Sequence, residues 1–169
     1  IGEFKLGVPH GRGVHMWPDE SIYIGEFRNG VANGYGTAIL KSGDTYQGDH
    51  KDGKKHGIGT FKWVNGDIYY GEYRNDRRHG KGKETYFEGD RYEGDWVSDN
   101  FEGTGIYFWA DGAIYQGEWE AGSMHGLGTL THANGEKECG IWRNDTLIQS
   151  YEENSYAQHL QIVRKIGNA

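Results

Sequence analysis

The 169-residue sequence has little proline, a single cysteine and no long apolar run. With Cys139 as its one cysteine, the chain cannot form an internal disulfide, which fits a reducing cytoplasm. No run of eighteen apolar residues occurs, so we expect no transmembrane helix, and we also expect no signal peptide. The net charge is -7, whereas a general nucleic-acid binder normally carries a basic surplus. We therefore expect a cytoplasmic protein with no nucleic-acid partner.

Glycine and aromatic residues are abundant instead. The 29 glycines follow no three-residue period and are accompanied by only two prolines, which excludes a collagen-like chain. Apolar residues make up only 35% of the sequence, yet aromatic residues reach 14%. Any hydrophobic core must therefore be thin and built largely from aromatic rings. The length is that of one domain, or of part of a longer chain.

The glycines recur with a fixed period along the chain. One glycine lies at every twenty-third position, namely Gly2, Gly25, Gly48, Gly71, Gly94, Gly117 and Gly140. A closely spaced pair keeps the same step, at Gly11/Gly13, Gly34/Gly36, Gly57/Gly59, Gly80/Gly82, Gly103/Gly105 and Gly126/Gly128. A third set comprises Gly43, Gly66, Gly89, Gly112 and Gly135, with Glu20 as the one departure. No insertion interrupts this period, so the chain is a tandem array of one short unit.

Each unit reads Tyr-x-Gly-Glu-Trp, a short polar loop, His-Gly-x-Gly, a strand-like run, and then Asp/Asn-Gly. The copies of the first motif are "YIGEF", "YQGDH", "YYGEY", "YEGDW" and "YQGEW". On these motifs the sequence resembles the MORN (membrane occupation and recognition nexus) repeat family over residues 1 to about 145. The resemblance implies an elongated, twisted and grooved sheet. It also implies roles in tethering cytoskeletal or membrane-associated assemblies, sometimes as homodimers.

The alternation of residues within a unit predicts a β-hairpin. In "YQGEW" the Tyr, Gly and Trp positions share one face, while Gln and Glu point to the other. A ring from a neighbouring strand can lie on the bare glycine backbone. The Asp/Asn-Gly pairs should form tight turns, with longer loops at the opposite edge. We therefore predict an all-β fold: an elongated single-layer antiparallel meander of 23-residue β-hairpin (MORN) repeats, with a short C-terminal α-helix.

The period divides the chain into two expected regions. Residues 1–150 form an array of about six to seven repeats, and we expect it to be N-terminally truncated because it opens at "IGEF", inside a unit. Residues 151–169 lose the period, and Asn154 and Ser155 can cap a helix there. Its apolar stripe comprises Tyr156, Leu160, Val163 and Ile166. This helix either caps the last hairpin or serves as a docking or dimerisation helix.

Four histidines share one repeat position, which raises the question of a metal site. They are His10, His56, His79 and His125. Equivalent positions in adjacent hairpins lie roughly 9–10 Å apart, whereas zinc needs nitrogens at about 2.0–2.1 Å from one ion. We therefore expect no metal site, and predict that these histidines hydrogen-bond the loop before the two glycines.

Nothing in the sequence indicates catalysis. A row of carboxylates, Glu26, Asp49, Glu72, Asp95 and Glu118, is regular, whereas catalysis needs one asymmetric site. We expect this row to be solvated and paired across strands. Nucleophile-elbow, zinc and kinase signatures are absent, and Gly80 and Gly82 lack the Walker spacing. We therefore predict no enzyme activity, no cofactor and no small-molecule substrate.

The aromatic face is the first candidate binding surface. A single-layer sheet leaves part of this face wet, and exposed aromatic patches mark partner surfaces. A helix or an extended peptide could lie along it. The predicted protein-binding groove comprises Tyr23, Phe27, Tyr46, Trp63, Tyr69, Tyr73, Tyr92, Trp96, Trp109, Tyr115 and Trp119.

A basic stripe on the loop edge is the second candidate. It comprises Lys51, Lys54, Lys55, Arg74, Arg77 and Arg78. The stripe either protects a sheet edge or binds an anionic partner, such as an acidic protein segment or phosphoinositide head groups. Asp52 and Asp76 lie within it and the net charge is -7, so we expect weak or no lipid binding.

These observations predict a non-enzymatic scaffold or adaptor that binds protein partners through the aromatic groove. We expect it in the cytoplasm at cytoskeletal or membrane-associated assemblies, with a homodimer as a further expectation from the resemblance. One alternative is a peripheral phosphoinositide-binding module that uses the basic loops. The other is the regulatory arm of a longer enzyme, because MORN arrays also occur in lipid kinases and in a lysine methyltransferase.

Overall fold

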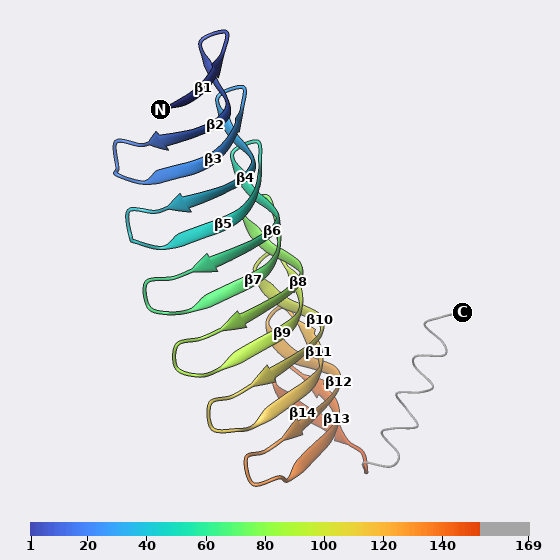
Figure 1. Cartoon of the computed structure of the whole chain (residues 1–169). Helices are drawn as coiled ribbons and strands as arrows, with labels where there is room; N and C mark the ends of the chain where they lie inside the picture. Colours follow the sequence, from blue (N-terminus) through green and yellow to red (C-terminus); the bar gives the residue numbers. More distant parts are fainter. Residues whose placement is uncertain (153–169) are drawn as a thin grey trace, which may run out of the picture. The chain divides into compact units, whose positions relative to one another are not determined.

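The computed structural model describes residues 1–152, which form fourteen β-strands and contain no helix (Figure 1). The strands are hydrogen-bonded in chain order within one sheet, which confirms the predicted antiparallel meander. They are β1 (Gly2–Lys5), β2 (Val8–Met16), β3 (Ile22–Arg28), β4 (Val31–Ile39), β5 (Thr45–Lys51), β6 (Lys54–Lys62), β7 (Ile68–Arg74), β8 (Arg77–Thr85), β9 (Arg91–Val97), β10 (Asn100–Phe108), β11 (Ile114–Glu120), β12 (Ser123–Thr131), β13 (Lys137–Arg143) and β14 (Thr146–Ser150). The expected C-terminal helix with Tyr156, Leu160, Val163 and Ile166 lies outside the described residues.

The described chain divides into two compact units. The first unit comprises residues 1–87 and 96–99 and contains β1–β8. The second unit comprises residues 88–95 and 100–152 and contains β10–β14. Within each unit, these strands pair antiparallel with their neighbours along the chain. The same hairpin therefore builds both units.

One edge of the sheet carries two-residue turns. Strand β5 ends at Lys51 and β6 begins at Lys54, which leaves Asp52 and Gly53 as the turn, with φ of 52° and 81°. Positive φ at both turn residues is the type I′ arrangement, which matches the twist of paired strands. We expected longer loops at this edge, and that expectation is wrong. The polar stretch before His-Gly is the start of a strand rather than a loop.

The Asp/Asn-Gly turns lie at the opposite edge and are the longer connections. Between β6 and β7 the chain turns through residues 63–67, where the Trp63 N–H donates to the Asp67 carbonyl at 3.0 Å. The Gly66 N–H donates to the Trp63 carbonyl at 3.0 Å, and Gly66 has a φ of 100°. The glycine thus supplies the positive φ that the sequence predicts, but not within a two-residue turn.

A β-bulge interrupts the β3–β4, β5–β6, β7–β8 and β11–β12 hairpins between their two ends. In β5 and β6, Gly48 lies opposite Gly59 and His50 opposite Lys55, so one residue of β5 faces three residues of β6. Gly57 lies in this bulge with a φ of 60°. Because the bulge changes the alternation, Lys55 lies on the same face as His50 and the glycine pairs.

The row of carboxylates holds these bulges. The Asp49 carboxylate accepts a hydrogen bond from the Ile58 N–H at 3.2 Å, and the Glu72 carboxylate accepts one from the Lys81 N–H at 2.9 Å. Glu3 and Asp95 accept the equivalent bonds from Arg12 and Thr104. We expected a solvated row paired across strands. Asp49 and Glu72 are exposed, and their bonds do cross to the partner strand, where they satisfy backbone N–H groups of the bulge.

The core is one layer of rings over glycine, as the sequence predicts. In each complete repeat the Tyr ring lies against the second glycine of the His-Gly-x-Gly motif, and its hydroxyl donates to a carbonyl three residues later. In the first unit the buried aromatic residues are Tyr23, Phe27, Tyr46, Phe61, Tyr69, Tyr73 and Trp96. In the second unit they are Tyr92, Tyr115, Trp119 and Trp142. Edge-to-face ring pairs along these rows each add about 0.5–1.5 kcal/mol beyond the area they bury.

Candidate functional site

The structure buries most of the predicted groove residues. Nine of the eleven are at most 9% exposed, while Trp63 and Trp109 are half-buried. The nine buried rings stack on one another and on glycine, so they build the core and offer little surface to a partner. That these rings contact a protein partner stays a prediction. The accessible surface near them consists of side chains at the rim of the aromatic face.

In the first unit this rim lies at the edge with the longer turns. The last ring of the hairpin, Trp63, lies 4.5 Å from Phe61 between ring centroids, and apolar residues follow it into the turn. Leu40, Val64 and Phe87 are 39%, 66% and 77% exposed. We call Leu40, Trp63, Val64, Tyr86 and Phe87 the turn-edge strip. Turns normally carry polar residues, and the strip is therefore an unusual apolar surface.

Contacts along the turn edge place these side chains in a series. Val64 lies over the turn that contains Gly43, and Phe87 lies over the turn that contains Gly66. Hydrogen bonds fix the backbone of both residues. The Phe87 N–H donates to the Asp67 carboxylate at 2.8 Å, and the Val64 N–H donates to the Asp44 carboxylate at 2.9 Å. The strip is thus held on ordered backbone.

Lys55 lies on the aromatic face, not in an exposed basic stripe. Its ammonium nitrogen is 5.8 Å from the Tyr46 ring centroid, 4.6 Å from that of Phe61 and 5.2 Å from that of Tyr73. These distances are typical of cation–π contacts. Burial lowers the pKa of the Lys55 ammonium, an effect that the negative charge of Asp76 opposes.

Arg78 occupies the equivalent place in the next repeat. Its guanidinium lies 4.3 Å from the Trp96 ring centroid, 2.6 Å from the Glu84 carboxylate and 3.3 Å from the Asp99 carboxylate. Burial raises the pKa of the Glu84 carboxyl, while hydrogen bonds from Tyr86 and Arg78 and the charge of Arg78 oppose that rise. This cation is therefore neutralised within the first unit.

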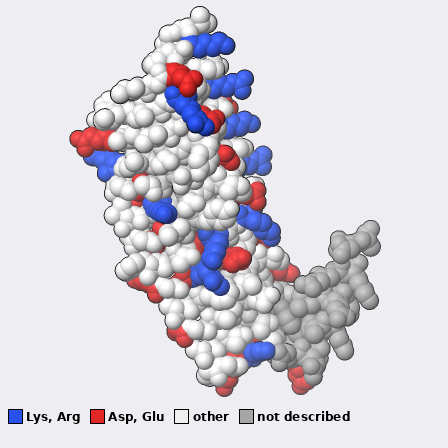
Figure 2. Space-filling model, in the orientation of Figure 1, with Lys and Arg blue, Asp and Glu red and all other residues white. Residues whose placement is uncertain are grey.

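The other four residues of the predicted stripe are exposed at the edge with two-residue turns. Lys51 pairs with Lys54 across one turn, and Arg74 pairs with Arg77 across the next. The sequence interpretation missed two further members of this row, exposed Lys5 and Arg28, which share the repeat position of Lys51 and Arg74. Figure 2 shows Lys and Arg side chains following one another along one margin of the first unit. The 23-residue step from 5 to 28, 51 and 74 would have revealed them.

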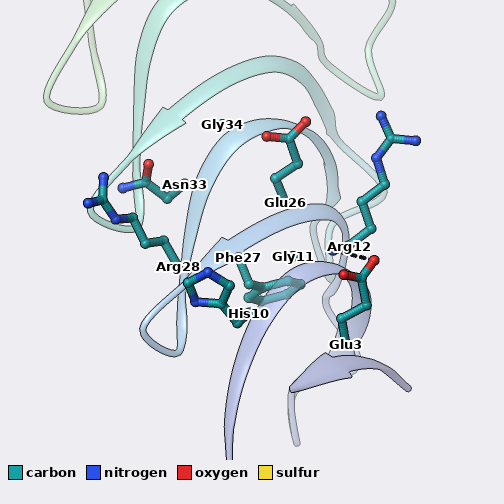
Figure 3. Close-up of a pocket in the computed structure, with 9 residues that line it drawn as sticks. All are labelled: Glu3, His10, Gly11, Arg12, Glu26, Phe27, Arg28, Asn33 and Gly34. Carbon is teal, nitrogen blue, oxygen red and sulfur yellow. Dashed lines mark hydrogen bonds between the residues drawn. The ribbon is translucent and has the colours of Figure 1, made fainter. Parts of the chain in front are cut away.

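A shallow pocket lies at the start of the first unit. Its volume is about 440 Å³. Figure 3 shows His10, Arg28 and Asn33 on one side and Glu3, Arg12 and Glu26 on the other, with Phe27 between them. The Glu3 carboxylate accepts a hydrogen bond from the Arg12 N–H at 3.3 Å. Its charges are mixed, and Glu3 is engaged with the backbone, so the pocket favours no particular ligand.

The histidine ring does not form the expected hydrogen bond in two of the repeats. The His125 Nδ1 atom lies 3.0 Å from the Glu120 carboxylate of its own hairpin, but it has no hydrogen-bond partner within residues 1–152. The Nδ1 atom of His56 is buried without a hydrogen-bond partner among residues 1–152, contrary to the expected bond to the loop. Instead, the His56 carbonyl accepts a bond from the Tyr46 hydroxyl at 3.5 Å. Within the described part of the chain, no group of three or more His, Cys, Asp or Glu residues could hold a metal ion.

A family model identifies the repeat. The model of the MORN repeat matches residues 1–22, 23–45, 46–68, 69–91, 92–114 and 115–137. The chain belongs to the MORN repeat family. The six matches follow one another without a gap, in the same register as the glycine period. MORN repeats are a non-catalytic module of protein or membrane interaction, and residues 1–152 contain no helix that could cross a membrane.

Other comparisons add little to this family assignment. No curated protein matches the MORN chain. Among solved structures, the TCP10 domain of Danio rerio CPAP, in complex with a STIL peptide, is 10% identical with a TM-score of 0.34, over 81% of this chain and 68% of that one. The TCP domain of Drosophila melanogaster SAS-4, in complex with a proline-rich motif of Ana2, is 13% identical with a TM-score of 0.34, over 79% and 85%. Both resemblances are weak.

Proposed function

We propose that this MORN array is a non-enzymatic scaffold that binds a helix or an extended segment of a partner protein along the turn-edge strip. The observation that supports this proposal is the exposure of Val64 and Phe87, at 66% and 77%, beside the half-buried Trp63. Large apolar side chains grouped on an ordered surface mark partner sites in soluble proteins. The buried rings beneath supply a rigid base, which limits the entropy lost on binding.

A displayed library of random peptides tests this proposal. We expect the wild type to enrich peptides with aromatic or aliphatic residues. The Val64→Ser/Phe87→Ser variant should lose their binding by tenfold or more, because it removes two anchors from the strip. The matched control is Ile58→Ser/Tyr70→Ser, which removes two side chains that are 46% and 58% exposed on the other face. Peptides that bind both variants equally well would contradict the proposal.

A second candidate function is binding to an anionic membrane surface. Lys5, Arg28, Lys51 and Arg74 are exposed at one repeat position, and each juxtamembrane cation adds about 1 kcal/mol to such binding. Co-sedimentation with phosphoinositide-containing vesicles at physiological salt tests it. The Arg28→Glu/Lys51→Glu/Arg74→Glu variant should abolish pelleting if this row binds the membrane. If the wild type stays in the supernatant, the row serves to protect the sheet edge.

Three further parts of the proposal concern context. The array acts at cytoskeletal or membrane-associated assemblies, and it self-associates as a homodimer. As an alternative, it serves as the regulatory arm of a longer enzyme. Analytical ultracentrifugation of the purified chain tests the dimer, and labelling of the full-length protein in cells tests the location.

A further inference from the structure

The Lys55 ammonium forms no hydrogen bond or close ion pair within residues 1–152, although the negative charges of Asp76 and Asp99 favour its charged form. Its ammonium lies within 5.8 Å of three ring centroids, and these rings are only 1%, 7% and 4% exposed. Among residues 1–152 no carboxylate or carbonyl oxygen accepts a hydrogen bond from this ammonium. Ring faces attract a cation but accept none of its three N–H bonds. Lys55 is half-buried as a residue, so part of it faces solvent.

Comparison with Arg78 shows what is missing at Lys55. Arg78 binds the Glu84 carboxylate, and the residue equivalent to Glu84 beside Lys55 is Phe61. Asp99 accepts the backbone N–H of Arg78 at 2.9 Å and also binds its side chain, whereas the equivalent Asp76 accepts only the backbone N–H of Lys55, at 2.8 Å. The Phe61 ring therefore occupies, beside Lys55, the position that the Glu84 carboxylate occupies beside Arg78 in the next repeat.

The remaining repeats confirm that a cation is not needed at this position for folding. The equivalent residues are Pro9, Ala32, Phe101 and Met124. Phe101 stacks on Tyr92 at 3.7 Å between centroids, so an apolar side chain fills the place well. A lysine here loses hydration on burial, and in return it gains the ring faces and the attraction of Asp76 and Asp99, but no hydrogen bond. Such an arrangement favours an anion supplied from outside.

We propose that Lys55 receives the carboxylate of an aspartate or glutamate from the protein segment that binds the turn-edge strip. This inference rests on the proposed function. The Phe61 ring contacts both the Lys55 ammonium at 4.6 Å and the Trp63 ring at 4.5 Å, so one buried ring links the cation to the strip. A partner segment would place an apolar side chain on the strip and an acidic one on Lys55. In this half-buried place a charge-assisted hydrogen bond is stronger than at an exposed lysine.

A double-mutant cycle with selected peptides tests the inference. Peptides are selected on the wild type from a random displayed library, and the best one is synthesised with its acidic residue and with Asp→Asn or Glu→Gln in its place. On the wild type we expect the amide version to bind at least tenfold more weakly. On Lys55→Met, which copies Met124, the two versions should differ by less than about twofold. Lys54→Met, an exposed neighbour, should retain the full difference.

A second measurement is independent of whether Lys55→Met folds. The ¹³Cε resonance of Lys55 in the wild type reports its titration, and we expect the acidic peptide to raise its pKa while the amide peptide does not. Three results would overturn the inference: selected peptides without acidic residues, an acidic preference that survives Lys55→Met, or an unchanged titration. If the wild type enriches no peptide that depends on Val64 and Phe87, the proposed function fails as well. Pelleting with phosphoinositide vesicles that requires Lys55 would assign the ammonium to a lipid head group instead.

Discussion

The ring of Tyr69 lies directly against Gly82, at a place where a Cβ atom would overlap the ring and its hydroxyl. The hydroxyl donates to the Glu72 carbonyl at 3.0 Å, which fixes the ring in position. Residue 82 must therefore be glycine because the Tyr69 ring leaves no room for a side chain, and not because the backbone conformation there demands glycine. The same relation holds between Tyr46 and Gly59.

Substituting Gly82→Ala should consequently destabilise the first unit. Overpacking a close contact costs about 1–3 kcal/mol, which outweighs the gain of about 0.4–1 kcal/mol from a less flexible unfolded chain. Urea unfolding followed by tryptophan fluorescence measures the change. The control is Lys83→Ala, since Lys83 is the exposed neighbour on the other face and should be nearly neutral. A Gly82→Ala variant as stable as the wild type would show that the ring moves aside freely.

The ion pair between Arg78 and Glu84 predicts a second result. Glu84 is 4% exposed and depends on Arg78 at 2.6 Å and on the Tyr86 hydroxyl at 2.6 Å. Arg78→Met alone should cost roughly 3 kcal/mol, because it leaves a buried carboxylate without its cation. The double variant Arg78→Met/Glu84→Leu copies the equivalent pair Met124 and Leu130, and it should restore most of the loss.

The control for this cycle is Glu84→Leu alone, which leaves Arg78 with Asp99 as its one carboxylate and should cost less than Arg78→Met. Thermal and urea unfolding of the wild type, the two single variants and the double variant give the coupling free energy between positions 78 and 84. Simple additivity of the two single changes would mean that the pair is not energetically coupled.

The fold could be predicted from the sequence because the period fixes both the hairpin and its register. With Gly25 and Gly48 one repeat apart, the glycines of neighbouring strands fall opposite one another, as Gly48 and Gly59 do. The edges were assigned wrongly, because Asn65-Gly66 is a typical tight-turn sequence, whereas Asp52-Gly53 was read as part of a polar loop. In the structure it is the latter pair that forms the two-residue turn.

The candidate site could be predicted only in part. The alternation of residues correctly placed the aromatic face, but it could not show that Tyr46 and Tyr73 would be covered by neighbouring rings. Lys54 and Lys55 are adjacent in sequence and were taken as one stripe. Because they start a strand, their side chains point to opposite faces, and Lys55 contacts the rings. Distances between rings and charges depend on side-chain packing, which the spacing of residues does not report.

A buried histidine makes stability depend on pH. His50 is 8% exposed, lies edge-on to Tyr23 and Tyr46 at 4.8 and 5.0 Å, and has its pKa lowered by burial. The charges of Asp76 and Asp49 act in the opposite direction, and that of Lys55 adds to the lowering.

Because the pKa of His50 is lower in the folded state, the unfolded chain binds the proton first. Stability should therefore fall as the pH drops below about 6.5, down to the pKa of the folded state. The matched variant is His50→Phe, which copies the equivalent Phe27 and removes the titration. Urea unfolding at pH 7.5 and 5.5 should show a smaller loss in His50→Phe than in the wild type. Equal losses of stability in the two proteins would show that other titratable groups cause the pH dependence.

The two-residue turns predict a stabilising substitution. Asp76 and Asp99 follow the first residue of their turns, have φ of 71° and 73°, and accept the backbone N–H of Lys55 and Arg78 at 2.8 and 2.9 Å. Gly53 occupies the same turn position with a φ of 81°, and its N–H donates to the Ala32 carbonyl at 2.9 Å. A Cβ atom at Gly53 would meet only Val31, at 4.0 Å.

Gly53→Asp should therefore bring a carboxylate to the Ala32 N–H and raise the free energy of unfolding by about 0.5–1.5 kcal/mol. Aspartate tolerates this backbone conformation better than most residues do, and the exposed Lys51 and Lys54 nearby favour its charge. Gly53→Ala is the control: it lacks the carboxylate and is strained at positive φ, so it should be neutral or destabilising. Urea unfolding of the three proteins decides between these outcomes. If Gly53→Asp proves no more stable than Gly53→Ala, a carboxylate at this turn position contributes no net stability. The hydrogen bonds that Asp76 and Asp99 accept would then not be needed for the stability of the fold.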